Sequence, residues 1–277
     1  MKDSMTATIA LIRDTFREAF ARKIFWGLFG LSTAMILFFL FLLRIDLVEG
    51  GLAAVSAFGQ FKTTQDVDRV VRGVYGWIAA FLYTWGLFLA VFASAGLIPS
   101  VLEPGRIELL LSKPVSRSHI LLGRYLGNVL VVSCNIIYLV LAVWIILGIK
   151  TNIWSPLFLV SIATTIFAFA VLLSVVILIG VLFESAALAT MVAAALMVMS
   201  LILAQTTFML KLLSSEWSRQ IWRTLYYTLP KIYDLGRITN NAIQSRTFDG
   251  FMPIWTSAVF AVVVLGCSLL VFARRDF

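Results

Sequence analysis

The sequence contains few of the residues that carry out catalysis or bind metals. Only 13% of its 277 residues are charged, and it has a single histidine, His119. The motifs GxxxxGK[ST], HExxH, CxxC and GxSxG do not occur in it. One histidine cannot supply two ligands to a metal site, and His119 lies beside Arg117 in a polar stretch rather than in a hydrolase-like pocket. We therefore expect no catalytic residue, no metal site and no cofactor bound by this chain.

Cysteine and clustered positive charge are scarce as well. The two cysteines, Cys134 and Cys267, lie inside apolar runs, where thiols usually pack as small hydrophobic groups. The formal net charge is +8, but the Lys and Arg residues are scattered between apolar segments. Because no basic run or basic-aromatic stripe is present, the sequence gives no sign of a nucleic-acid partner.

Long apolar runs are abundant. Hydrophobic residues make up 61% of the sequence, and several runs reach the roughly 20 residues that a helix needs to cross a bilayer. Continuous apolar runs favour helices over the alternating pattern of membrane β-barrels. We therefore predict an all-α polytopic membrane protein in which residues 1–277 form one transmembrane domain. Its six predicted spans are 24–43, 74–98, 126–149, 157–183, 186–210 and 251–273.

An amphipathic helix is predicted before the first span. In residues 8–23, Ile9, Ile12, Phe16 and Phe20 recur at helical spacing, with basic residues on other faces. Such a helix lies in the membrane interface among anionic headgroups, although a charged stub before the first span is the alternative. The residues expected to make this membrane contact are Arg13, Phe16, Arg17, Phe20, Arg22 and Lys23.

Orientation follows from the flanks of the first span. Lys and Arg residues are equally shared between the two sides of the six spans, so their total does not decide it. Arg22 and Lys23 directly precede the first span, and only Arg44 follows it. The positive-inside rule therefore places both termini, and the segment 99–125, in the cytoplasm.

The outer loop 211–250 contains a second amphipathic pattern. Apolar and aromatic residues recur at helical spacing from Trp217 up to Pro230. This predicts a short helix on or in the outer leaflet; a plain interfacial loop and an outer gate over a translocation path are both open interpretations. The candidate gate residues are Trp222, Tyr226, Leu229 and Pro230.

Ionisable residues are almost absent from the predicted spans. Glu184 falls in a turn, Arg44 lies at the end of a span, and the one histidine is in the cytoplasmic stretch. Transporters driven by an ion gradient usually carry acids or histidines along their path. Coupling to an ion gradient is therefore disfavoured.

The stretch from residue 99 to 127 is the longest polar interruption that carries a pattern. A Glu103-Pro104-Gly105 turn precedes two predicted helical turns from Arg106 to Lys113, which Pro114 ends. Ser116 is expected to cap the helix of the third span. The leucines at 109–111 are too apolar for a free loop, so they either enter a groove on another protein or pack under the bundle.

This pattern resembles a known family. The run Gly105-Arg106-Ile107-Glu108-Leu109-Leu110-Leu111-Ser112-Lys113-Pro114-Val115-Ser116-Arg117, followed by Leu122-Gly123-Arg124, is similar to the intracellular coupling segment of permease subunits in type-2 exporters of the ATP-binding-cassette (ABC) class. The family commonly has threonine where this chain has Arg106, and lysine where it has Arg124. The resemblance implies that a short coupling helix within 105–117 docks onto an ATPase, through Gly105, Arg106, Glu108, Leu109, Leu110, Lys113, Pro114 and Arg117.

The same resemblance implies the partners and the location. They would be a separate ABC ATPase subunit that binds ATP and Mg, a second permease copy in a homodimer or related heterodimer, and the lipid bilayer of the plasma (inner) membrane. Leu109 and Leu110 would form the apolar anchor, with Glu108 and Arg117 making polar contacts. The alternatives are a membrane-embedded enzyme acting on lipid or peptide, for which only dispersed Ser and Thr residues are available, and a non-transporting assembly scaffold.

Overall fold

The computed structural model describes residues 13–15, 17, 18, 20, 21, 23–42, 64–96, 116–151, 153–206, 209, 215–244 and 250–274. All regular secondary structure in these residues is helical, which confirms the all-α prediction. The elements in chain order are α2 (Lys23–Leu42), α4 (Thr64–Ala95), α6 (Arg117–Thr151), the 3₁₀ turn η2 (Pro156–Leu159), α7 (Val160–Phe183), α8 (Ala186–Leu203), α10 (Glu216–Thr228), α11 (Ile232–Ile243) and α12 (Met252–Arg274).

Five helical stretches are long and apolar enough to cross a membrane, and α2 contributes a shorter apolar one, Phe25–Phe41. The protein is thus a polytopic membrane protein. The five longer stretches are Arg72–Ala95, Arg117–Lys150, Pro156–Phe183, Ala186–Leu203 and Met252–Arg274.

The helix ends differ from the predicted span limits. α4 begins at Thr64 and α6 at Arg117, well before the predicted spans at 74 and 126, whereas α8 ends at Leu203 rather than 210. For α4 and α6 the reason is that hydropathy marks where a helix becomes apolar, whereas the helix itself already begins in the preceding polar residues.

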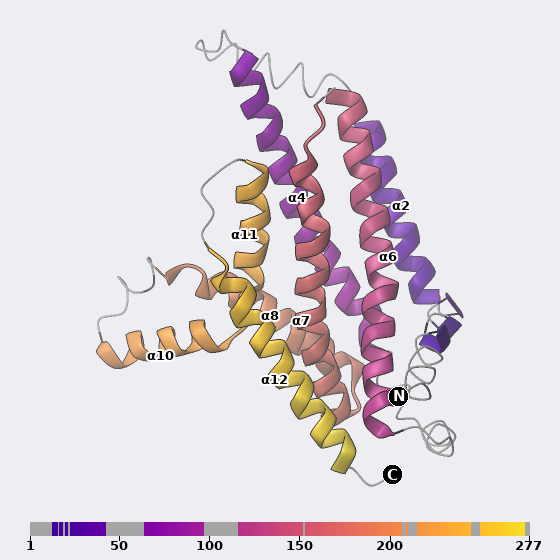
Figure 1. Ribbon diagram of the computed structural model, residues 1–277, viewed down its shortest axis with the longest axis vertical. Coiled ribbons are helices and arrows are strands. Elements are labelled where there is room, and N and C mark those ends of the chain that lie inside the picture. The colour runs from indigo at the N-terminus through magenta and orange to yellow at the C-terminus, as the bar shows by residue number, and fades with distance from the viewer. Residues whose placement is uncertain are drawn as a thin grey trace.

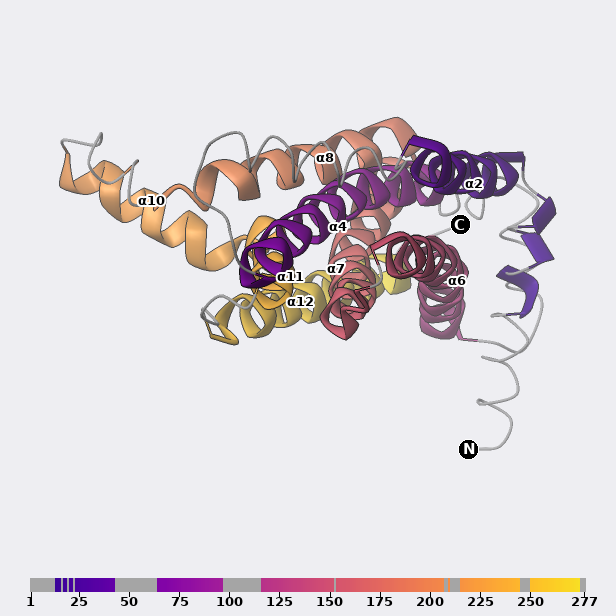
Figure 2. The same cartoon turned by 90° about the horizontal axis from the view of Figure 1, so that it is seen from above.

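Helix α7 is the centre of the bundle. It packs against α4, α6, α8 and α12, and Figure 2 shows it surrounded by these helices. Its sequence is apolar on every side, as expected for a helix enclosed by others. Its innermost side chains are fully buried: Ala168, Phe169, Leu172, Leu173, Val176, Ile177 and Val181.

Two hydrogen bonds between polar side chains connect neighbouring helices inside the bundle. Asn135 of α6 donates to the hydroxyl of Ser32 in α2 at 3.1 Å, and the hydroxyls of Thr164 and Thr239 lie 2.6 Å apart between α7 and α11. In a membrane, such bonds fix the relative position of helices because an unpaired polar group in hydrocarbon is costly. They therefore contribute to a defined arrangement of α2, α6, α7 and α11.

The segment after α8 forms two helices of opposite character. α10 extends sideways from the bundle (Figure 1), and none of its residues is buried. α11, which follows it, packs against α4, α7 and α8 and buries six residues. The sequence predicted the first of these helices but treated the region of α11 as loop.

Candidate functional site

Most of the predicted docking residues lie outside the described part of the chain. Gly105, Arg106, Glu108, Leu109, Leu110, Lys113 and Pro114 all belong to this set, whereas Arg117 is the first residue of α6. Ser116 lies just before α6, and its Oγ accepts a hydrogen bond from the amide of His119 at 3.4 Å. The predicted cap is therefore present, and α6 starts within the predicted cytoplasmic segment 99–125.

The helices before and after the predicted docking segment are joined by a buried hydrogen bond. Ser94, at the end of α4, donates to Oδ1 of Asn128 in α6 at 3.2 Å. The two residues are only 1% and 3% exposed, so water does not compete for this bond. The end of α4 and the first part of α6 therefore have a fixed relative position.

The N-terminal helical segment packs on the same part of α6. Residues 13–15, 17, 18, 20 and 21 are helical, and Thr15 is fully buried. A Cβ atom added to Gly127 of α6 would lie 2.6 Å from Cβ of Thr15, so the close approach depends on glycine at this position.

Buried Arg124 links the same two elements. Its side chain is 2% exposed; Nη2 lies 3.2 Å from Oδ2 of Asp14, and Nη1 donates to Oε2 of Glu18. We call Asp14, Thr15, Glu18, Ser94, Arg124, Gly127 and Asn128 the α6 root. The sequence signal for it was present: Asp14 and Glu18 are four residues apart, on one face of the predicted helix, and Arg124 is a charge at the start of an apolar run.

The residues predicted to contact the membrane surround the contact between the N-terminal helical segment and α6. The side chains of Arg13, Arg17, Phe20 and Lys23 are exposed, and those of Phe16 and Arg22 lie outside the described set. Because the acidic face of the segment meets α6, the exposed basic and aromatic side chains are free of that contact and available to another surface.

The second predicted group, the candidate outer gate, is centred on the junction between α10 and α11. Tyr226 donates from its hydroxyl to Oδ2 of Asp234 at 3.1 Å. Nζ of Lys231 lies 4.0 Å from the centre of the Tyr226 ring and 5.1 Å from that of Tyr227. We call Tyr226, Tyr227, Lys231 and Asp234 the α10–α11 corner. Of the other candidates, Pro230 is buried at this corner, whereas Trp222 and Leu229 are half-buried.

Two charged side chains of the corner, Lys231 and Asp234, are buried. The side chain of Lys231 is 3% exposed and that of Asp234 4%, and Arg237 lies 3.6 Å from the other carboxylate oxygen of Asp234. Burial lowers the pKa of Lys231, while the charge of Asp234 acts in the opposite direction. Burial and the Asp234 carboxylate raise the pKa of Tyr226 to about 12. The corner is thus a compact charged cluster in which the tyrosine keeps its proton.

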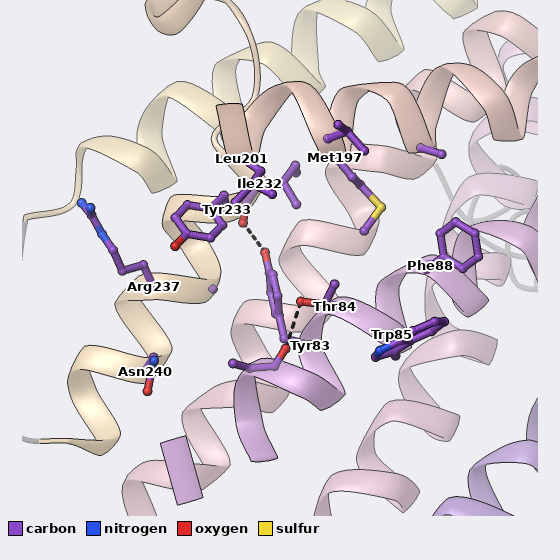
Figure 3. Close-up of a pocket in the computed structure, with 14 residues that line it drawn as sticks. Tyr83, Thr84, Trp85, Phe88, Met197, Leu201, Ile232, Tyr233, Arg237 and Asn240 are labelled. Carbon is purple, nitrogen blue, oxygen red and sulfur yellow. Dashed lines mark hydrogen bonds between the residues drawn. The ribbon is translucent and has the colours of Figure 1, made fainter. Parts of the chain in front are cut away.

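An apolar cavity of about 450 Å³ lies between α4, α8 and α11 (Figure 3). Apolar side chains such as Phe88 of α4 and Met197 of α8 line it, and Arg237 and Asn240 of α11 supply polar groups. Tyr83 contributes to its wall and donates to the carbonyl of Ile232 at 2.6 Å. The lining of the cavity is therefore mainly apolar, with a few polar groups among its residues.

No candidate metal site of three or more His, Cys, Asp or Glu residues occurs in the part of the chain that the structure describes.

Comparison with known proteins agrees with this architecture. Residues 9–277 match the sequence model of a family described as "ABC-2 family transporter protein", so the match covers nearly the whole chain. A search of curated protein sequences found no match to the chain. Since the family match extends from the N-terminal helical segment through α12, the chain belongs to the ABC-2 transporter family and is a membrane-spanning permease component.

Proposed function

We propose that this chain is the permease subunit of an ATP-driven exporter and that it binds a separate ATPase subunit through residues 105–117. The observation that carries the proposal is the bond between Ser94 and Asn128, which joins α4 and α6 on either side of this segment. A segment mounted on two joined helices can pass a push from a partner to both of them as a rigid-body movement.

The residue types of the segment suit docking. Leu109 and Leu110 would enter an apolar groove on the ATPase, with Glu108 and Arg117 making polar contacts at its edge. ATP and Mg would bind to the partner. In this arrangement both termini and the docking segment face the cytoplasm, and the chain resides in the plasma (inner) membrane.

A translocation path would form between two permease copies. The cavity between α4, α8 and α11 offers a mainly apolar wall with Arg237 and Asn240 as polar groups, which suits amphipathic cargo. Trp222, Tyr226, Leu229 and Pro230 would then lie at the outer end of that path. Because Tyr226 bonds to Asp234 of α11, a gate at this position would move with the corner rather than as a free loop.

The proposal is tested by capturing the ATPase. The tagged chain is purified in mild detergent from cells that express its natural partners, and the amount of co-purified ATPase is measured for Leu110→Asp. We expect the ATPase to fall at least tenfold while insertion into the membrane is unchanged. Leu225→Asp, the same substitution on exposed α10, is the matched control and should retain the ATPase.

Two outcomes would contradict the proposal. Absence of any ATPase from the wild-type preparation would argue against a separate ATPase partner. Equal amounts with Leu110→Asp and wild type would show that the segment is not the docking element.

A further inference from the structure

The N-terminal helical segment is attached to α6 by a combination of contacts. Arg124 is 2% exposed and faces carboxylates from two successive turns of that segment, Asp14 and Glu18. A planar guanidinium can bond to two carboxylates in fixed directions, which a lysine ammonium does with less geometric definition. One turn further along α6, Thr15 packs directly on Gly127.

The same turn of α6 also bonds to α4. Asn128 follows Gly127 directly and accepts the hydrogen bond from Ser94. The first turns of α6 are therefore joined to the N-terminal segment through Arg124 and Gly127 and to α4 through Asn128. Three pieces of chain that are far apart in sequence meet at the α6 root.

We propose that Arg124 is a positioning residue that joins the N-terminal helical segment, α6 and the end of α4 into one rigid body. Movement of the docking segment is then transmitted to the N-terminal helical segment. The inference rests on the proposed function for the docking role of residues 105–117. In this arrangement the segment that lies on the membrane surface moves together with the docking segment. Without Arg124, the docking segment still binds its partner, but its movement is no longer conveyed to the N-terminal segment.

Two carboxylates compensate for the burial of the Arg124 guanidinium. A guanidinium at 2% exposure is stable only when anionic partners compensate for its lost hydration. Glu18 is 11% exposed and provides the shielded partner, whereas Asp14, at 58%, contributes from the exposed side of the contact. Glu18 is therefore the residue to exchange with Arg124 in a test.

The rigid body is tested by a distance measurement on the full chain. Spin labels are placed at Arg13→Cys and Leu126→Cys, both exposed, in a background in which Cys134 and Cys267 are replaced by alanine. We expect a narrow distance distribution in the wild type, a broad one in Arg124→Gln, and a narrow one again in the exchanged variant Arg124→Glu with Glu18→Arg and Asp14→Asn, in which no like charge faces position 124. A broad distribution in the wild type, or an unchanged one in Arg124→Gln, would overturn the inference.

An exposed ion pair supplies the matched control. Arg219 and Glu216 lie 3.2 Å apart on α10, at 37% and 89% exposure. Exchanging these two charges should leave the Arg13–Leu126 distance distribution unchanged, because exposed pairs contribute little. Broadening in this control would show that the label distance responds to general loosening, and it would contradict the assignment to Arg124.

The effect on coupling is read from ATP turnover by the purified complex. Because the nucleotide site is expected on the partner, Arg124→Gln should lower kcat at least fivefold, leave KM for ATP unchanged, and retain a normal amount of bound ATPase. If Arg124→Gln only made the permease unstable, less complex would be recovered, but the kcat of the complex that remains would be unchanged. If the wild-type complex contains no ATPase, the proposed function is wrong, and the distance measurement still tests whether the three elements form one rigid body. If Arg124→Gln has the same kcat as the wild type, the inference about Arg124 is wrong and the proposed function is unaffected.

Discussion

The α6 root and the α10–α11 corner each contain one deeply buried basic side chain, but they accommodate it differently. Arg124 faces carboxylates from a separate, distant segment. Lys231 has no hydrogen-bond partner for Nζ, lies over the rings of Tyr226 and Tyr227, and is near Asp234 of the next helix. Directional bonds fix one geometry, whereas ring faces and a nearby charge stabilise a cation over a range of positions.

This difference suggests different roles for the two places. The α6 root joins elements that must keep one arrangement if a push is to be transmitted. The α10–α11 corner joins a helix without buried residues to one that is packed in the bundle. A contact that tolerates small changes in angle would allow α10 to change its tilt relative to α11.

The largest effect is expected from removing the cation at the α6 root. Arg124→Met removes the guanidinium that lies against the carboxylates of Asp14 and Glu18, and breaking a buried ion pair typically costs about 3–5 kcal/mol. Thermal unfolding of the detergent-purified chain should show a clearly lower midpoint than that of the wild type. An unchanged midpoint would mean that the buried ion pair does not stabilise the root.

Two glycine contacts give an intermediate and graded effect. An added Cβ at Gly236 of α11 would lie 2.7 Å from the Tyr83 ring, whose hydroxyl is bonded to the carbonyl of Ile232, whereas one at Gly127 would meet Thr15. Overpacking of this kind costs about 1–3 kcal/mol. Because Tyr83 is fixed inside the bundle and Thr15 belongs to a peripheral segment, Gly236→Ala should lower the unfolding midpoint more than Gly127→Ala; the reverse order would contradict the comparison.

The smallest effect is expected from removing the cation at the corner. Lys231→Met keeps the length of the side chain, and Asp234 retains the hydroxyl of Tyr226 and the guanidinium of Arg237 as partners. Because Nζ of Lys231 has no hydrogen-bond partner to lose and the Asp234 carboxylate stays compensated, the unfolding free energy should stay within about 1 kcal/mol of the wild type. A loss as large as that of Arg124→Met would show that the two cations have equivalent roles.

The sequence predicted the features that depend on local patterns. The all-α membrane class follows from long apolar runs, α10 from helical spacing between Trp217 and Leu229, and the Ser116 cap from a hydroxyl residue directly before a helix. Each of these rests on residues within a few positions of one another, so a single sequence contains the whole signal.

The features that the sequence did not predict depend on contacts between residues far apart in the chain. α11 contains Gly236, Asn240 and Asn241, which have low helix propensity, and it is stabilised by burial against α4 and α7. The contact between Arg124 and Glu18 joins residues 106 positions apart. Charge at the start of a span marks Arg124 as unusual, but only the fold brings the N-terminal segment to it.

An ATPase can reach residues 99–115 only if they face the cytoplasm, and labelling of a single cysteine tests this directly. Ser112→Cys is introduced into the chain with Cys134 and Cys267 replaced by alanine and treated with a membrane-impermeant thiol reagent, with Trp217→Cys in exposed α10 as the opposite-side control. We predict that Ser112→Cys reacts in inside-out vesicles and not in intact cells, and that Trp217→Cys behaves in the reverse way. Reaction of Ser112→Cys in intact cells would place the docking segment outside and contradict the account.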